Sequence, residues 1–240
     1  LRSQESAQQD LTTWLAAETE AHGAEAAPAD PPAPRSTPLF YPAWEVLPHE
    51  ARLPHVDVIS ERLETLVALL SSASSGAASP PLIVTRVAAL LQRTFAVATL
   101  RAATRTLARG DRLDPLEVVE WLEAQGYEPE ARVTQKGELA LRGGILDVYP
   151  LTSPWPVRLE FFGDELESLR QFDPLTQVSR EEIQTVALAP AGELGLLRQS
   201  RSETASSAAP SPPLAPGTLL DYLPPETVLI LCEPEALAER

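Results

Sequence analysis

The residues that could do chemistry are few, and the single lysine shows why we expect no nucleotide hydrolysis. Lys136 is followed directly by Gly137 and Glu138. A phosphate-binding loop instead needs glycines for close backbone approach and then Lys-Ser or Lys-Thr for the phosphates and magnesium. No such string occurs in the chain. The sequence therefore predicts no ATP-hydrolysing loop of this kind and no bound cofactor.

The three histidines are His22, His49 and His55. Metal ligation would need further well-spaced His, Cys or carboxylate groups, so Glu50 and Asp57 make a metal site conceivable but not expected. The carboxylates at positions 164, 165 and 167 lie at an expected hairpin, where such charges are usually solvated. There is no Gly-x-Ser-x-Gly elbow either. We predict no catalytic, cofactor-binding or metal-binding residue, and hence no enzymatic activity in this chain.

A strand-like segment at 157–162 combines an arginine, a carboxylate and an aromatic residue on one face. Side chains alternate across a strand, which separates an apolar core face from a mixed face. The two sets are Val157, Leu159 and Phe161 against Arg158, Glu160 and Phe162. An aromatic beside an arginine on an exposed sheet face is typical of a protein–protein hot spot. Alternatively, Phe162 packs under a loop and Arg158 pairs with Glu160 or Glu167, and the pattern alone does not decide.

The glycines at 143 and 144 lie inside another expected strand, where they suggest a β-bulge that could re-aim Arg142. If the mixed face binds a partner, we expect Arg158→Ala to weaken binding by about 2 kcal/mol. Strand alternation places Arg158 on the exposed face, so folding should then be barely affected.

The net charge of −15 argues against DNA binding by bulk electrostatics, because phosphates need concentrated positive charge. Positive charge does gather at Arg101, Arg105 and Arg109, which recur every four residues and would form one stripe on a helix. A solvated helix face is the favoured interpretation of this stripe, and a contact site for an acidic partner is the alternative.

The only cysteine is Cys232, so no internal disulfide is possible and a reducing, cytoplasmic setting is expected. It ends the apolar run 228–232, which is typical of a buried strand and makes Cys232 a core residue rather than a nucleophile. No apolar run approaches the roughly 20 residues of a membrane helix, so no membrane contact is expected. The chain has no methionine, even at position 1, which suggests a segment of a longer protein.

The elements that position these residues fall into three blocks, with low-complexity linkers at 21–38, 71–81 and 198–216. The first block, 1–98, alternates strands and helices and predicts a parallel α/β layer. Its expected helices are 8–21, 58–70 and 87–95, and its expected strands 38–41 and 82–85. The middle helix is the most convincing, since Ile59, Leu63, Leu66 and Leu70 share one face.

The second block, 99–190, begins with a helix that Asp114 caps and Pro115 opens, and that Gly126 ends. Leu116, Val119 and Leu122 are expected on its buried side. Strands are expected at 130–134, 138–149, 156–162, 165–172 and 183–188. This order predicts an α+β domain with an antiparallel sheet. The third block, 191–240, is expected to be a linker and a return to the α/β layer.

Two of these strings carry a resemblance to a known family. Residues 142–147 (RGGILD) and 158–165 (RLEFFGDE) resemble the UvrA-binding domain that UvrB shares with the transcription-repair coupling factor (Mfd) family. Residues 172–177 (FDPLTQ), 41–48 (YPAWEVLP) and 59–63 (ISERL) resemble the coupling factors. The alternative is the N-terminal part of a UvrB-type damaged-DNA-binding excision nuclease subunit. Against it, the chain lacks a phosphate loop, and only residues 48–57 are available for UvrB's DNA-clamping hairpin.

The resemblance implies a fold and a role. The fold would be a degenerate P-loop-NTPase-like α/β layer, 1–98, an inserted UvrA-binding α+β domain, 99–190, and a return to the first layer. The role would be to recruit UvrA to stalled RNA polymerase in transcription-coupled repair. Matching the family's motif places the UvrA-binding residues at Arg142, Arg158 and Phe162. ATP, magnesium, RNA polymerase and DNA would bind only other parts of the parent protein, whose domains could also mask the UvrA-binding surface.

Overall fold

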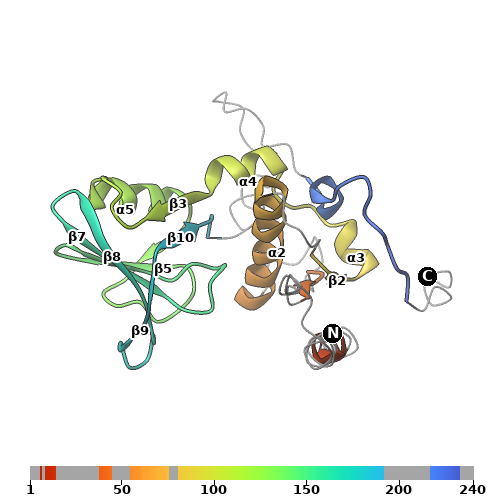
Figure 1. Ribbon diagram of the computed structural model, residues 1–240, viewed down its shortest axis with the longest axis horizontal. Helices are drawn as coiled ribbons and strands as arrows, with labels where there is room; N and C mark the ends of the chain where they lie inside the picture. The colour runs from red at the N-terminus through yellow and green to blue at the C-terminus, as the bar shows by residue number, and fades with distance from the viewer. Residues whose placement is uncertain are drawn as a thin grey trace, which may run out of the picture.

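The computed structural model describes residues 6, 9–14, 38–44, 55–75, 81–191 and 217–232 of the 240-residue chain. Within them the chain forms two neighbouring parts, one built around the long helix α2 and one around a six-stranded sheet (Figure 1). The mixture of helix and sheet expected from the sequence is confirmed. No helix within the described ranges is long and apolar enough to cross a membrane.

The first part contains a strand–helix–strand unit. Its elements are β1 (Leu39–Tyr41), α2 (Val56–Ser75) and β2 (Ile83–Thr85), and the two strands pair in parallel. The predicted face of α2 is confirmed, because Ile59, Leu63, Leu66 and Leu70 are all buried. The helix extends five residues into the segment predicted as the linker 71–81. Residues 9–14 are helical, as predicted for 8–21, whereas Leu15 and the rest of that segment lie outside the described residues.

The single helix predicted at 87–95 is wrong. Two short helices, α3 (Val87–Leu90) and α4 (Val97–Ala103), flank a break at Thr94. The backbone of Thr94 is held there by Gly217, since each residue's N–H donates to the other's carbonyl, at 2.8 and 2.9 Å. A residue paired in this way cannot continue a helical ladder.

The arginine stripe expected on one helix is also wrong, because α4 ends before its second member. Arg101 lies in α4, Arg105 in strand β3 (Arg105–Ala108), and Arg109 in the turn that follows. Arg105 lies over the Trp121 ring at 5.9 Å, and Arg109 forms an ion pair with Glu182 at 3.1 Å.

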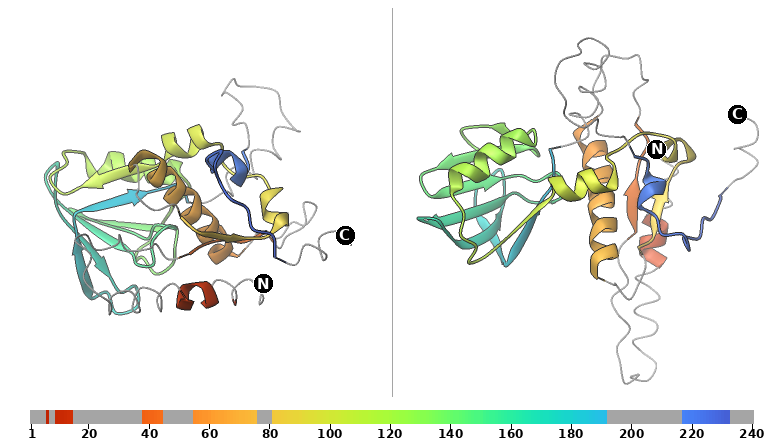
Figure 2. Two further views of the ribbon diagram at one scale, coloured as in Figure 1. Left: turned by 45° about the vertical axis from the view of Figure 1, so that its right-hand side comes forward. Right: turned by 90° about the horizontal axis from the view of Figure 1, so that it is seen from above.

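The second part is a sheet of order β4-β5-β6-β7-β8-β9, antiparallel except for the parallel pair β4–β5. Its strands are β4 (Glu128–Pro129), β5 (Glu138–Arg142), β6 (Ile145–Val148), β7 (Val157–Phe162), β8 (Glu165–Phe172) and β9 (Ser179–Ile183). Helix α5 (Pro115–Ala124) covers one face, and β3 pairs separately with β10 (Thr185–Leu188). Figure 2 shows α4 running between this part and α2.

The start of α5 is as predicted, since the Asp114 side chain accepts a hydrogen bond from the backbone N–H of Leu116. The predicted buried face is confirmed at Leu122, which is buried, and at Val119, which is partly buried against the core. It is wrong at Leu116, which is 59% exposed, and Val118 is buried instead. Gly126 follows the helix with φ of 91°, the left-handed conformation that ends many helices.

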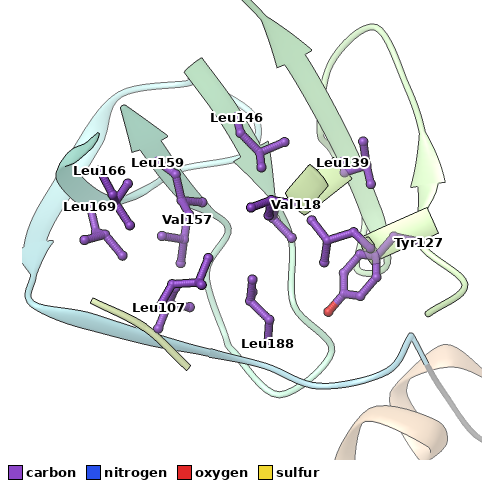
Figure 3. Close-up of a cluster of buried hydrophobic side chains, with 13 residues drawn as sticks. Leu107, Val118, Tyr127, Leu139, Leu146, Val157, Leu159, Leu166, Leu169 and Leu188 are labelled. Atoms are coloured by element: carbon purple, nitrogen blue, oxygen red, sulfur yellow. The ribbon is translucent and has the colours of Figure 1, made fainter. Parts of the chain in front are cut away.

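Helix α5 and the sheet enclose one apolar core (Figure 3). The buried residues of the sheet include Leu139, Leu146, Val157, Leu159, Leu166 and Leu169. Leu107 and Leu188, from the β3–β10 ribbon, close the core from the side. Burial of these apolar side chains is the main contribution to the free energy that holds α5 against the sheet.

Three strand predictions need correction. No strand forms at 130–134, and the segment 138–149 is a hairpin whose strands pair Arg142 with Ile145. Gly143 and Gly144 are therefore its turn, not a bulge, and Gly143 has φ of 63°. A Cβ at Gly144 would lie 2.7 Å from the Phe161 carbonyl oxygen, which explains a glycine there. The segment predicted at 183–188 contains the last residue of β9, a break at Gln184 and all of β10.

The C-terminal segment returns to the first part through the 3-10 helix η1 (Leu219–Tyr222), where Leu219 packs into the α2 core. The strand predicted at 228–232 is wrong, since the segment has no regular structure and its side chains are exposed. Cys232 is accordingly exposed rather than a core residue. The backbone of residues 228–232 pairs with no strand within the described ranges. An apolar run forms a strand only when its N–H and C=O groups are paired with a neighbouring strand.

Candidate functional site

The face of the sheet opposite α5 has a buried carboxylate at its centre. Asp147, in β6, is fully buried and accepts hydrogen bonds from two arginines. The Arg158 Nε donates to Oδ1 at 2.7 Å and its Nη2 to Oδ2 at 2.9 Å. The Arg142 Nη2 donates to Oδ2 at 2.7 Å. A bidentate pair with a third charge-assisted bond fixes both guanidinium groups in place.

Strand register explains this cluster. Asp147 of β6 is paired with Ala140 of β5 on one side and with Arg158 of β7 on the other. Arg142 reaches Asp147 from the adjacent position on β5, at the start of the hairpin turn. Arg158 is the paired neighbour of Asp147, and Arg142, which pairs with Ile145, lies diagonal to it, so the long side chains of both arginines can reach the carboxylate.

Arg158 is less exposed than strand alternation suggested. Its side chain is only 18% exposed, and its guanidinium lies 4.6 Å from the centre of the buried Phe172 ring. The hydrogen bond to Asp147 raises the pKa of Arg158 above its ordinary value, while burial opposes this. The condition for barely affected folding, an exposed Arg158, is therefore not met. Because replacing Arg158 would leave a buried carboxylate with one partner fewer, we expect Arg158→Ala to lower stability as well.

Arg158 pairs with Asp147, and not with Glu160 or Glu167 as the alternative interpretation of the sequence suggested. Glu160 accepts a hydrogen bond from the Ser168 hydroxyl at 2.6 Å and forms an ion pair with Arg170 at 3.2 Å. Glu160 therefore stabilises the neighbouring strand β8 rather than holding Arg158, although its charge helps to keep Arg158 protonated.

Phe162 ends β7 with its side chain 79% exposed, so it does not pack under a loop. The preceding Phe161 packs against the α5 core and anchors the strand end. The Phe161 N–H also donates to the Gly144 carbonyl at 2.7 Å, which places Phe162 beside the β5–β6 turn. Exposure of an aromatic ring costs free energy in water and is typical of a surface that a partner covers.

A hollow of about 570 Å³ lies on this face, and we call it the arginine hollow. Its lining residues are Arg132, Arg142, Ile145, Arg158 and Gln177. Arg142 and Arg158 were predicted from the sequence as site residues, whereas Arg132, Gln177 and the buried carboxylate of Asp147 were not. The strings 142–147 and 172–177 contained Asp147 and Gln177, but only the folded chain brings Arg132 to them.

The turn after β8 positions the far side of the hollow. The Asp173 carboxylate accepts hydrogen bonds from the backbone N–H groups of Leu175 and Thr176, at 2.9 and 2.8 Å. These bonds, led by the one from Thr176, lower the pKa of Asp173. The Arg132 Nη2 donates to the carbonyls of Pro174 and Leu175, and so ties the turn to the segment after β4.

This arrangement suits binding rather than catalysis. Three guanidinium groups surround the hollow, and arginine recognises carboxylate or phosphate oxygens with a planar set of N–H donors. A permanently charged guanidinium is a poor proton-transfer group near neutral pH. Within the described ranges, no three His, Cys, Asp or Glu residues gather as a metal site would require.

Comparison with known proteins identifies relatives of this chain. Residues 106–194 match the UvrB interaction domain family. The transcription-repair-coupling factor of Haemophilus influenzae is 38% identical over 154 residues, which are 64% of this chain and 13% of that protein. That of Escherichia coli is 36% identical over 150 residues, 62% of this chain and 12% of that protein. That of Mycobacterium tuberculosis is 33% identical, covering 83% of this chain and 19% of that protein. The chain thus spans less than a fifth of the length of these relatives.

Proposed function

Because this chain contains a UvrB interaction domain and is a homologue of transcription-repair-coupling factors, we propose that its six-stranded sheet is a recruitment surface for UvrA. The observation that carries the proposal is the exposed ring of Phe162 on the same sheet as two arginines held by a buried carboxylate. Such a surface offers one apolar anchor and fixed charges without any catalytic group.

Arg142, Arg158 and Phe162 are the proposed UvrA-binding residues. Arg142 is half exposed and keeps N–H groups beyond those bound to Asp147, so it can reach a partner directly. Arg158 is mostly buried, and its contribution would be made at the floor of the hollow. Phe162 supplies apolar area that becomes buried on binding.

The wider role of the parent protein follows the relatives' name, which couples transcription to repair. In this account the chain brings UvrA to a stalled RNA polymerase in the bacterial cytoplasm. ATP hydrolysis with magnesium, and contact with the polymerase and DNA, belong to other parts of the parent. The segment in hand contributes binding and no catalysis.

The first part of the chain is proposed to be a degenerate P-loop-NTPase-like layer. Its parallel β1–β2 pair connected by α2 has the strand–helix–strand form of such layers. The limits 1–98, 99–190 and 191–240 for the layer, the UvrA-binding domain and the return segment are part of the same proposal. Several contacts tie the layer to the sheet domain. The Lys136 ammonium donates to the Ser60 hydroxyl of α2 at 2.6 Å, and this hydroxyl donates to the carbonyl of Leu151, whose side chain packs into the α2 core.

Calorimetric titration with purified UvrA tests the binding role. We expect the wild-type chain to bind, and the double variant Arg142→Gln/Phe162→Ala to bind at least about 100-fold more weakly, because two exposed contacts are lost. This pair leaves the bidentate Asp147–Arg158 ion pair intact but removes the Arg142 bond to the buried carboxylate, so we expect a moderately lower melting temperature and compare binding at a temperature where both proteins are folded. Equal affinity of the two proteins, or no binding by a folded wild-type chain, would contradict the proposal.

A further inference from the structure

The arginine hollow carries more positive charge than the proposed UvrA-binding residues account for. Its lining includes Arg132, on the segment after β4, in addition to Arg142 and Arg158. We propose that the hollow receives an acidic side chain of the bound protein, and that Arg132 binds this carboxylate together with Arg142 and Arg158. The identity of the partner rests on the proposed function, whereas the chemistry of the hollow rests on the structure.

All three guanidinium groups keep N–H donors beyond those that hold the fold. Arg132 uses only its Nη2, for the carbonyls of the turn, and Arg142 uses only its Nη2, for Asp147. Arg158 uses Nε and Nη2. Within the part of the chain that the structure describes, the other nitrogens of these arginines have no hydrogen-bond partner. Unused donors at a concave surface are what a carboxylate of a partner requires.

The charges of the lining are not balanced within the hollow. Three arginines line it, and among the residues that the structure describes the carboxylate bound to any of them is Asp147, which two of them share. Arg132 makes its bonds to carbonyl oxygens, which leave its charge uncompensated. An incoming carboxylate would therefore lower the repulsion among the three cations as well as accept their hydrogen bonds.

Arg132 is held in a fixed position, as a binding residue must be. Asp173 closes the turn by accepting bonds from Leu175 and Thr176, and the turn's carbonyls in turn hold the Arg132 Nη2. Gln177, with φ of 62°, locks the same turn by donating from Nε2 to the Val133 and Pro174 carbonyls. A guanidinium held before binding loses less conformational entropy when the ligand arrives.

A protein carboxylate fits this surface better than a nucleic-acid phosphate. The chain has a net charge of −15, so a polyanion would be repelled outside this one locus. The surroundings are also apolar, with Ile145 in the lining and Leu175 highly exposed on the turn. Apolar side chains around a small charged centre are typical of protein–protein interfaces, and not of surfaces that bind a nucleic-acid backbone.

The first test compares the affinity of UvrA for wild-type chain and Arg132→Gln. We expect about a tenfold loss, because one charge-assisted contact is removed. Arg132→Lys should recover only part of it, since lysine lacks the planar pair of donors. Arg101→Gln removes the same charge from an exposed position in α4 and should bind as wild type. Equal binding by wild type and Arg132→Gln would overturn the inference while the proposed function stands.

The second test needs no UvrA. A peptide with one side-chain carboxylate, acetyl-Ala-Glu-Ala-amide, is titrated into the chain while the Nε–Hε signals of its arginines are followed by NMR, with a thymidine oligonucleotide in a parallel titration. We expect the peptide to shift the signals of Arg132, Arg142 and Arg158 and to leave that of Arg101 in place. These shifts would support the hollow even if the chain failed to bind UvrA. Absence of the shifts, or a stronger response to the oligonucleotide, would overturn the inference.

Discussion

Replacing Asp147 with alanine is expected to lower the free energy of unfolding by about 3 kcal/mol and to abolish binding of UvrA. Asp147 is fully buried and is the shared acceptor of Arg142 and Arg158. Without it, the poorly exposed Arg158 loses its counter-charge and lies close to a second cation. This loss of stability is at the low end of the range for breaking a buried ion pair, because Arg142 is half exposed and water screens its charge.

Urea unfolding followed by circular dichroism measures this effect. The matched variant Asp147→Asn keeps the shape and one acceptor oxygen but not the charge, so it should lie between wild type and Asp147→Ala. An Asp147→Ala variant with the wild-type unfolding midpoint would show that the carboxylate does not organise this face of the sheet.

Replacing Phe172 with alanine is expected to cost about 3–4 kcal/mol of stability, as for other fully buried phenylalanines. Phe172 forms a small second core with Val133 and Ala140 on the site face of the sheet, and its ring lies beneath the Arg158 guanidinium. The truncation would leave a cavity there and remove the cation–π contact. Arg158 would then be free to change rotamer, which should weaken UvrA binding as well.

The control for this variant is Phe172→Leu, which keeps most of the apolar volume but no aromatic face. Phe172→Leu should recover most of the stability. If packing orients Arg158, UvrA binding should recover too; if the cation–π contact orients it, binding should stay weak. Thermal unfolding and UvrA titration of the two variants separate these effects. A fully stable Phe172→Ala variant would contradict the packing described for this face.

Local signals were sufficient where neighbouring residues decide the structure. The period of apolar residues fixed the buried face of α2, and Asp114 with Pro115 marked the start of α5. The strands around 157–162 and 165–172 were recognisable because alternating apolar residues meet one core. In each case the residues that form the element also contain the information for it.

Contacts between residues far apart in the sequence determine the structure of the segments that were predicted wrongly. Thr94 breaks the expected helix because Gly217, far along the chain, takes its backbone hydrogen bonds. The apolar run 228–232 had the composition of a strand, but composition does not supply a pairing partner. Both errors arise where a tertiary contact, present or absent, outweighs local propensity.

The site was foreseen only in part for the same reason. The sequence suggested an arginine and an aromatic on one strand face, and the structure places Phe162 at the surface and Arg158 largely below it. The role of Asp147 depends on strand register, which pairs it with Arg158. Arg132 enters the site through the turn at 174–177, a contact that no spacing in the sequence indicates.

The most direct test of the recruitment surface is one residue, Phe162. Because its ring is 79% exposed, Phe162→Ala should leave the melting temperature unchanged. In titrations with purified UvrA we expect it to weaken binding by about 30-fold, or about 2 kcal/mol, as for a central aromatic contact. Leu116→Ala, which truncates another exposed apolar residue on the α5 side, should bind as wild type. If Phe162→Ala binds UvrA as tightly as wild type, this face of the sheet is not the surface that UvrA recognises.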